Sequence, residues 1–274
     1  MKRDVLRLSA LVCVLLLTLD ANAQKLHVGA TTGINTTFIL DKGLFDDPRY
    51  NSTYTYAFSP IGLAVGFDFG PRFGLQLESI LTNQTQIFEV IDIAKTVVGE
   101  RRIDLQSINI PLLFKFMNGS GNRARMNFSL GPQLAILTEG RETLEYAAST
   151  QEIPPGVAIP EGAVENGDGT YNVPAMSKTE LLSTLADNEL EKFKKTQVQL
   201  AGNIGVDIDL THNIYLSTLI RVNYSLTDMR NDELIAILKQ GGNLADDIFG
   251  RRANLLVGFQ FGVHYMFGGV WSGR

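Results

Sequence analysis

The chain has 274 residues, with 24 Lys or Arg against 29 Asp or Glu, so its formal net charge is −5 at neutral pH. This acidic balance argues against nucleic acid as a partner. The one cysteine, Cys13, lies close to the N-terminus, so we expect no disulfide, thiol-dependent catalysis or cysteine–metal site in the mature chain.

The chain begins with the pattern of a secretory signal peptide. Three basic residues precede an apolar stretch at 8–19, and an Ala-x-Ala sequence ends at Ala23. That stretch is shorter than the roughly 20 apolar residues that a membrane-spanning helix needs. We therefore expect residues 1–23 to be removed during export. Export leads either to a soluble periplasmic or secreted protein, or to a membrane that is crossed by strands.

Apolar and polar residues alternate over eight later segments, which is typical of strands with two unlike faces. The predicted strands are 25–39, 57–69, 73–90, 101–117, 123–138, 196–210, 214–228 and 251–267. In the last segment, one parity carries Leu, Val, Phe and Tyr, and the other carries mostly Gly, Asn, Gln and His. Strands of this length exceed the roughly 9–11 residues that cross a membrane, so several should project beyond it.

Short and long connections follow one another strictly between these strands. Residues 70–72, 118–122 and 211–213 are tight turns, whereas 40–56, 91–99, 139–195 and 229–250 are longer. Outer-membrane barrels have short periplasmic turns and long outer loops in this order. We therefore predict an all-β fold: an eight-stranded antiparallel up-and-down transmembrane β-barrel over residues 24–267, followed by a C-terminal tail at 268–274.

The turn at 211–213 allows the strand register to be checked. If it is a three-residue hairpin loop with Asn213 in the left-handed region, Ile204 faces Ile220 and every apolar residue meets the apolar parity. A slip of one residue would move each large side chain to the wrong face. The pattern is therefore consistent with one register.

The bulky apolar residues on one face of each strand should face lipid, and the small polar residues on the other face should face the lumen, because eight strands enclose little more than side chains. The alternative is a soluble periplasmic β-protein whose apolar parity faces a shared core. Such a protein would need neither strands this long nor the alternation of short and long connections. We therefore expect the outer membrane, with lipid in contact with the barrel.

One hairpin is distinctive beyond its periodicity. Residues 107–116 read SINIPLLFKF and residues 130–134 read LGPQL. These segments are similar to adjacent strands of the PorT-like outer-membrane β-barrel family, and the resemblance extends from about Gln24 to Phe267. It implies an eight-stranded barrel in the outer membrane of Gram-negative bacteria, with a part in protein secretion for some members.

Two prolines, Pro111 and Pro132, lie in the middle of the strands of this hairpin. Each removes a hydrogen-bond donor from the sheet, and a closed barrel has no edge at which to place it. The sequence therefore predicts β-bulges at both positions.

The inward parity of the barrel collects titratable residues. They are Asp68, Glu78, Lys115, Asp207, Asp209, Arg221 and His264. They could form a ligand site or an ion path, or a hydrogen-bonded network that fills the lumen. Because charges in so narrow a space must pair, we predict the structural network, with no metal and no cofactor.

A lipid-modifying enzyme is the sharpest catalytic alternative. It would need a base beside a nucleophile, and His264 is the histidine expected to face inward from the last strand. No nucleophile motif such as G-x-S-x-G accompanies it. The expectation is therefore a non-enzymatic protein without catalytic residues.

The long outer loops carry the remaining signals. Ser177-x-x-Glu180 is a capping box ahead of several leucines, which predicts a helix near 178–195 in the third outer loop. Residues 165–169 (ENGDG) resemble a calcium loop but lack its ligand spacing, so a turn is expected. A second, shorter helix is predicted at 232–240, ended by Gly241.

Recognition functions are expected in these outer loops, because loops on a rigid scaffold are where binding residues gather. The predicted role is structural, binding or secretion-accessory, with an envelope or secretion protein as the possible partner. The lumen is expected to be too narrow for a general porin. The oligomeric state is left open.

Overall fold

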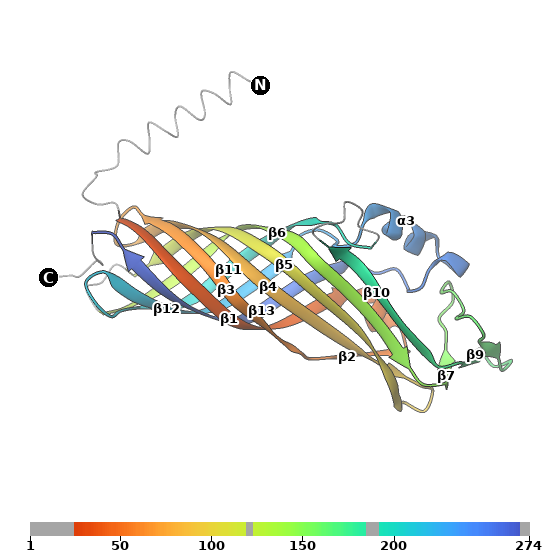
Figure 1. The fold of residues 1–274 in the computed structure, drawn as a ribbon. Helices are drawn as coiled ribbons and strands as arrows, with labels where there is room; N and C mark the ends of the chain where they lie inside the picture. The colour runs from red at the N-terminus through yellow and green to blue at the C-terminus, as the bar shows by residue number, and fades with distance from the viewer. Residues whose placement is uncertain (1–24, 119–122, 185–191, 269–274) are drawn as a thin grey trace, which may run out of the picture.

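A computed structural model describes residues 25–118, 123–184 and 192–268, and it contains the predicted eight-stranded barrel (Figure 1). The barrel strands are β1 (Lys25–Asp41), β3 (Tyr56–Asp68), β4 (Phe73–Ile91), β5 (Val97–Met117), β6 (Ala124–Tyr146), β11 (Thr196–Asp209), β12 (Ile214–Ser225) and β13 (Arg252–Met266). Each pairs antiparallel with the next, and β13 pairs with β1 to close the ring. The predicted signal peptide and most of the predicted tail lie outside the described residues.

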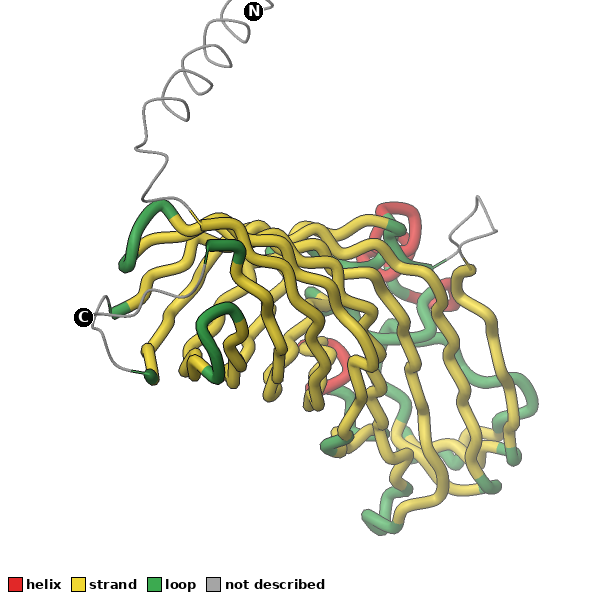
Figure 2. The backbone as a smooth tube through the Cα atoms, turned by 60° about the vertical axis from the view of Figure 1, so that its left-hand side comes forward, coloured by secondary structure: helices red, strands yellow, loops and turns green. Residues whose placement is uncertain are grey.

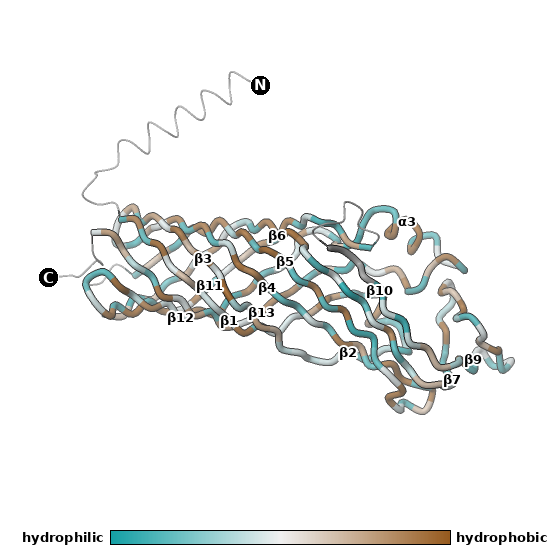
Figure 3. The backbone as a smooth tube through the Cα atoms, viewed as in Figure 1, coloured by the Kyte–Doolittle hydropathy of each residue, from teal (hydrophilic) through white to brown (hydrophobic). Residues whose placement is uncertain are grey.

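The two faces of the barrel wall are assigned as predicted. Side chains such as Leu63, Met126 and Phe259 point outward and are 56–60% exposed. Their strand neighbours of the other parity, such as Gln260, are buried in the lumen. Figure 3 shows the resulting alternation of hydrophobic and hydrophilic residues along the strands.

The two ends of the barrel differ as the connection lengths predicted. The start of β1, the end of β13 and the turns at 70–72 and 211–213 lie at one end, and the long loops lie at the other (Figures 1 and 2). Because outer-membrane barrels keep short turns in the periplasm, we assign the long-loop end to the outer side. The register after the second turn is also confirmed, with Ile204 opposite Ile220.

The conformation predicted for Asn213 in that turn is wrong. Lys95 is the only non-glycine residue with a positive φ in the described part of the chain, so Asn213 is not left-handed. The Thr211 hydroxyl accepts a hydrogen bond from the Ile214 amide at 3.1 Å, and the Asn213 side chain donates one to the Met266 carbonyl at 2.9 Å. These side-chain bonds hold the turn without a left-handed residue.

The predicted bulges at Pro111 and Pro132 are also wrong. The β4–β5 and β5–β6 registers are the same on both sides of the prolines, and only a few residue pairs drop out of each ladder. The missing donors are therefore tolerated as local gaps. A register shift occurs instead opposite Pro60 in β3, between the pairs Thr31–Gly62 and Gly33–Ser59, and both Pro60 and Ile61 face outward there.

Beyond the membrane, three barrel strands continue outward as an open wall. The outer parts of β4, β5 and β6 stay paired, β2 (Tyr50–Thr53) adds to β4, and β10 (Met176–Thr184) adds to β6. The result is a half-cylinder in the order β10–β6–β5–β4–β2. A small sheet of β7 (Ser149–Glu152), β9 (Thr170–Val173) and β8 (Val164–Glu165) lies at its tip, as Figure 1 shows for β7 and β9.

The strand β10 corrects the helix predicted near 178–195. Residues 178–184 are extended and pair with Glu139–Leu144 of β6, while 185–191 lie outside the described residues. Since β6 runs on to Tyr146, it offers an edge whose backbone groups need partners. That tertiary pairing outweighs the local capping-box pattern.

Two structural predictions for the loops, the short helix and the turn, are confirmed. Helix α3 spans Asp232–Gln240, Asn231 caps it by accepting from the Leu234 amide, and Gly241 follows with φ 65°. Residues 166–169 form the turn between β8 and β9. A short helix, α2 (Lys42–Asp46), and a 3₁₀ turn, η2 (Gly242–Leu244), complete the outer loops. Within the described ranges, no helix is long and apolar enough to cross a membrane.

Candidate functional site

The titratable residues predicted to face the lumen are brought together there. Asp68, Glu78, Lys115, Asp207, Arg221 and His264 are each at most 6% exposed, and Asp209 is partly buried at the periplasmic mouth. Lys115 Nζ lies 2.6 Å from Asp207 Oδ2, and Arg221 Nη1 lies 2.7 Å from Glu78 Oε2. Opposite charges in the narrow lumen therefore pair across the barrel.

Three lumen residues were missed by the sequence analysis: His27, Arg125 and Tyr215. Arg125 pairs with Asp209 at 2.8 Å, and the Tyr215 ring stacks on His264 at 4.6 Å between ring centroids. His27 packs edge-on against the same pair. Their inward parity was the available signal, because each alternates with apolar residues that face lipid.

Glycine makes room for the two lumen histidines. A Cβ at Gly29 would lie 2.2 Å from His264 Nδ1, and one at Gly66 would lie 2.0 Å from His27 Nε2. Because these distances are far below van der Waals contact, a larger residue at either position would displace an imidazole ring. The glycines in the wall thus fix where the rings lie.

Two small cavities lie in the lumen between these side chains. One cavity, beside Lys115 and His264, has a volume of about 10 Å³, and another, beside Asn35 and Arg221, has about 20 Å³. A single buried water needs roughly 10–15 Å³. Each cavity therefore has room for about one water molecule.

An apolar layer, which we call the apolar lid, lies in the outer mouth of the barrel. It comprises Ile39, Leu44, Phe88, Ile103, Leu105, Leu137, Phe193 and Met229, each at most 4% exposed. Strands supply five of these residues, and Leu44, Phe193 and Met229 come from three different outer loops. The expectation of a polar inward face is therefore wrong at the outer end of the barrel.

A chain of buried ion pairs joins the lid region to the last outer loop. Asp41 on β1 pairs with Arg252 on β13 at 2.6 Å, and Arg230 lies 3.6 Å from the same carboxylate. Arg101 on β5 donates to both oxygens of Asp247, at 2.5 and 2.9 Å. Burial acts to raise the pKa of Asp247, but the Arg101 guanidinium outweighs it and holds that pKa well below its usual range.

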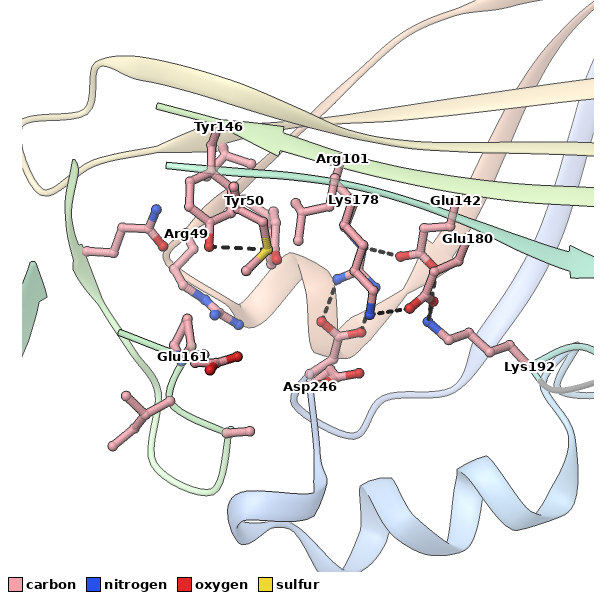
Figure 4. A pocket seen from close by; sticks show the side chains of 18 residues that line it. Arg49, Tyr50, Arg101, Glu142, Tyr146, Glu161, Lys178, Glu180, Lys192 and Asp246 are labelled. Atoms are coloured by element: carbon pink, nitrogen blue, oxygen red, sulfur yellow. Dashed lines mark hydrogen bonds and ion pairs between the residues drawn. The ribbon is translucent and has the colours of Figure 1, made fainter. Parts of the chain in front are cut away.

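Above the lid, an outer pocket of about 280 Å³ lies between the half-cylinder and the loops that face it (Figure 4). Arg101 and Glu142 project into it from the barrel strands, and Lys178 projects from β10. Glu161 and Asp246 face them from the third and fourth outer loops. The pocket thus has one wall built on paired strands and one wall built on loops.

Charged groups on the strand side of the pocket are tightly paired. Glu142 accepts from Arg101 at 2.5 Å, and Lys192 lies 3.8 Å from its second oxygen. Burial acts to raise the pKa of Glu180, but hydrogen bonds from the Lys178 and Lys192 ammonium groups lower it to about 2. None of these residues is a site residue predicted from the sequence, because the loop segments that complete the pocket have no periodic signal.

The family comparison agrees with this architecture. The outer membrane protein beta-barrel domain matches residues 22–231, which is most of the chain. This chain belongs to that family. The protein therefore resides in the outer membrane, and the soluble periplasmic alternative is excluded. No curated protein sequence matches the chain.

Several solved structures are similar to this family member. OprG from Pseudomonas aeruginosa shares 11% identity over 89% of this chain and 96% of its own, with a TM-score of 0.41. Neisserial surface protein A shares 10% over 88% and 97%, with a TM-score of 0.38. The outer membrane protease OmpT from Escherichia coli shares 12% over 91% and 98%, also with a TM-score of 0.38. At these identities and TM-scores the likeness carries no information on ligand or activity.

Proposed function

We propose that this barrel is a non-enzymatic recognition protein, which binds at its outer pocket and surrounding loops and does not pass solutes through its lumen. One observation carries the proposal. The outer pocket has a volume of about 280 Å³, whereas the two lumen cavities beneath the apolar lid have about 10 and 20 Å³. Space for a ligand is thus found on the outer side, and ion pairs and apolar packing fill the path below it.

The resemblance of residues 107–116 and 130–134 to PorT-like strands supports a finer proposal. Some members of that family take part in protein secretion, so we propose an envelope or secretion protein as the partner. The loop wall of the pocket is the part of this chain that such a partner could reach from outside. The lipid-facing side of the barrel contacts outer-membrane lipid, and nucleic acid is not proposed as a ligand.

Replacing the third outer loop tests the recognition role. Tyr146 at the end of β6 pairs with Met176 at the start of β10, so residues 147–175 can be replaced by Asn-Gly, the two-residue turn that suits such a hairpin. This change removes the part of the loop wall that the third outer loop contributes, including Glu161, and leaves β6 and β10 paired. We expect an affinity-tagged barrel to lose its co-purifying envelope protein when solubilised from native membranes.

A matched control shortens a loop that does not line the pocket. Residues 92–96 connect β4 and β5, and Ile91 pairs with Val97, so Asn-Gly fits there too. This variant should keep the partner. Identical co-purifying proteins in all three samples, or none with the intact chain, would refute the recognition role.

One contact in the lumen bears on the alternative of a lipid-modifying enzyme. Ser217 Oγ lies 2.9 Å from His264 Nε2, which is the distance between a nucleophile and its base. Both side chains are at most 4% exposed, and the cavity beside His264 has about 10 Å³, too little for an acyl chain. In a lipid-modifying enzyme, His264→Gln would abolish lipid turnover in a barrel of unchanged stability; we expect only a lower midpoint of thermal unfolding.

A further inference from the structure

We infer that the outer pocket binds an organic cation, namely a primary ammonium or guanidinium group on a short apolar stem. The inference deepens the proposed function and rests on it, since it names the chemistry that the same pocket recognises. Three features of the pocket carry it: which charges are already paired, which acceptors are not, and what lies beside them.

The cationic groups of the pocket are all paired within the protein. Arg101 binds Glu142 and Asp247. Lys178 and Lys192 both bind Glu180, and Arg49 Nη2 lies 2.7 Å from Asp47 Oδ2. An anionic ligand would have to compete with these internal carboxylates for every cation.

Acceptors, in contrast, are left over. The carboxylates of Glu161 and Asp246 line the pocket and make no hydrogen bond or ion pair with any residue that the structure describes. Gln151 is 2% exposed and donates through Nε2 to Ser149 Oγ at 3.0 Å, but its Oε1 accepts from no described donor. Two carboxylates that form no ion pair, together with the Gln151 carbonyl oxygen, favour a ligand that donates hydrogen bonds and carries positive charge.

The remaining lining suits an apolar stem. Leu144, Tyr146, Ile159, Pro160 and Met176 line the same cavity. An aliphatic chain can bury its methylenes against such a surface while its charged end stays at the carboxylates. A volume of about 280 Å³ is at the lower end of ligand pockets, so it suits a group the size of one long side chain rather than a polymer.

This chemistry has two possible sources. A free small amine would bind as a complete ligand, whereas the Lys or Arg side chain of a partner protein would enter the pocket as an anchor. Both sources require the same acceptors in the pocket. They differ in whether a protein partner depends on these acceptors.

Binding of blocked amino acids to the full-length barrel in lipid nanodiscs tests the inference. The probes are N-acetyl-lysine amide, N-acetyl-norleucine amide, which has a similar stem without the charge, and N-acetyl-glutamate amide. We expect the lysine probe to bind at least about tenfold more tightly than norleucine, the ratio that one charge-assisted hydrogen bond provides. The glutamate probe should bind most weakly. Equal binding of lysine and norleucine, or preference for glutamate, would overturn the inference.

Two variants tie the preference to the pocket. The double variant Glu161→Gln with Asp246→Asn removes both unpaired charges from exposed positions, so the barrel should stay folded, and it should lose the preference for lysine. The matched control Glu165→Gln removes an exposed carboxylate from β8, outside the pocket lining, and should keep it. An unchanged preference in the double variant would also overturn the inference.

The double variant also separates the two sources and the two proposals. Loss of both lysine binding and the co-purifying protein identifies a partner side chain, while loss of lysine binding alone identifies a free amine. If replacing 147–175 removes the partner but no probe prefers the charged stem, the recognition role stands and the cation inference falls. If lysine binds as expected but no partner depends on the loop, the protein-partner part of the proposed function falls instead.

Discussion

Apolar and polar residues alternate along the strands both in the barrel inside the membrane and in the half-cylinder above it. The face that carries the apolar residues differs between the two regions. Within the membrane the outward residues are apolar and the inward residues are charged, as in the lumen pair Glu78–Arg221. Above the membrane the same β5 strand turns Ile103 into the apolar lid and Arg102 and Asp104 toward water. The pleat of a strand sets only that two faces exist; the solvent on each side decides which residues each face must carry.

The difference extends to what stabilises each region. The lumen depends on ion pairs that are removed from water, where loss of one partner leaves an uncompensated charge. The half-cylinder has buried ion pairs of its own, such as Arg101–Asp247, but it also buries apolar side chains against the loops, which the lumen does not. Variants in the two regions should therefore respond differently to the same kind of change.

The largest effect is expected in the lumen. Arg221→Leu leaves the Glu78 carboxylate buried without its partner, and this should cost about 3–5 kcal/mol of unfolding free energy. Urea unfolding in lipid vesicles measures the loss. The double variant with Glu78→Gln should recover part of it, and a loss below about 1 kcal/mol would show that the pair is not isolated from water.

A smaller loss is expected in the apolar lid. Ile103→Ala removes a fully buried side chain and should cost about 2–5 kcal/mol, because a cavity remains. Hydrogen exchange of the lid amides reports the effect locally. Leu63→Ala on the lipid face is the matched control, since lipid chains can fill the space that it leaves. Equal effects of the two changes would contradict the contrast between protein and lipid surroundings.

Acid should loosen the β10 side of the pocket. The pKa of Glu180 is lowered from its usual value of 4.5 to about 2, so its ion pairs contribute fully above pH 4.5 and are lost as the pH falls toward 2. Faster amide exchange in β10 between these pH values is the expected readout. Glu180→Gln should exchange at a pH-independent rate over that range, after correction for intrinsic exchange; a persistent step would assign the change to another group.

The smallest effect is expected at the surface of the half-cylinder. Arg102 Nε lies 2.8 Å from Asp104 Oδ2, but both side chains are more than one-third exposed. Arg102→Leu should therefore cost less than about 1 kcal/mol, as for other solvent-exposed pairs. The same urea unfolding assay compares it with Arg221→Leu, and comparable losses would erase the distinction between the two regions.

Most of the membrane part of the fold could be predicted from sequence because its constraints are periodic. Alternation placed the strands, and the short turns fixed pairs such as Ile204–Ile220. Helix α3 was predictable because a polar cap precedes it and Gly241 ends it. In these cases the local sequence and the tertiary structure demand the same conformation.

The outer site could not be predicted in the same way. Leu44, Phe193 and Met229 meet in the lid from three separate loops, and no spacing in the sequence relates them. The sequence predicts a helix in place of β10, because nothing in it shows that β6 continues past residue 138 and offers β10 an edge to pair with. The pocket beside β10 depends on that longer strand, so the local sequence does not predict it.

The pairing of β1 with β13 has a consequence for biogenesis. It joins His27 to Met266 and Asp41 to Arg252, so the wall has two open edges until the last strand is in place. Open edges cannot persist in hydrocarbon. The unfolded chain must therefore cross the periplasm with its lipid-facing apolar side chains shielded by other proteins. A truncated chain that ends before β13 should fail to insert on its own, even with its other seven strands complete.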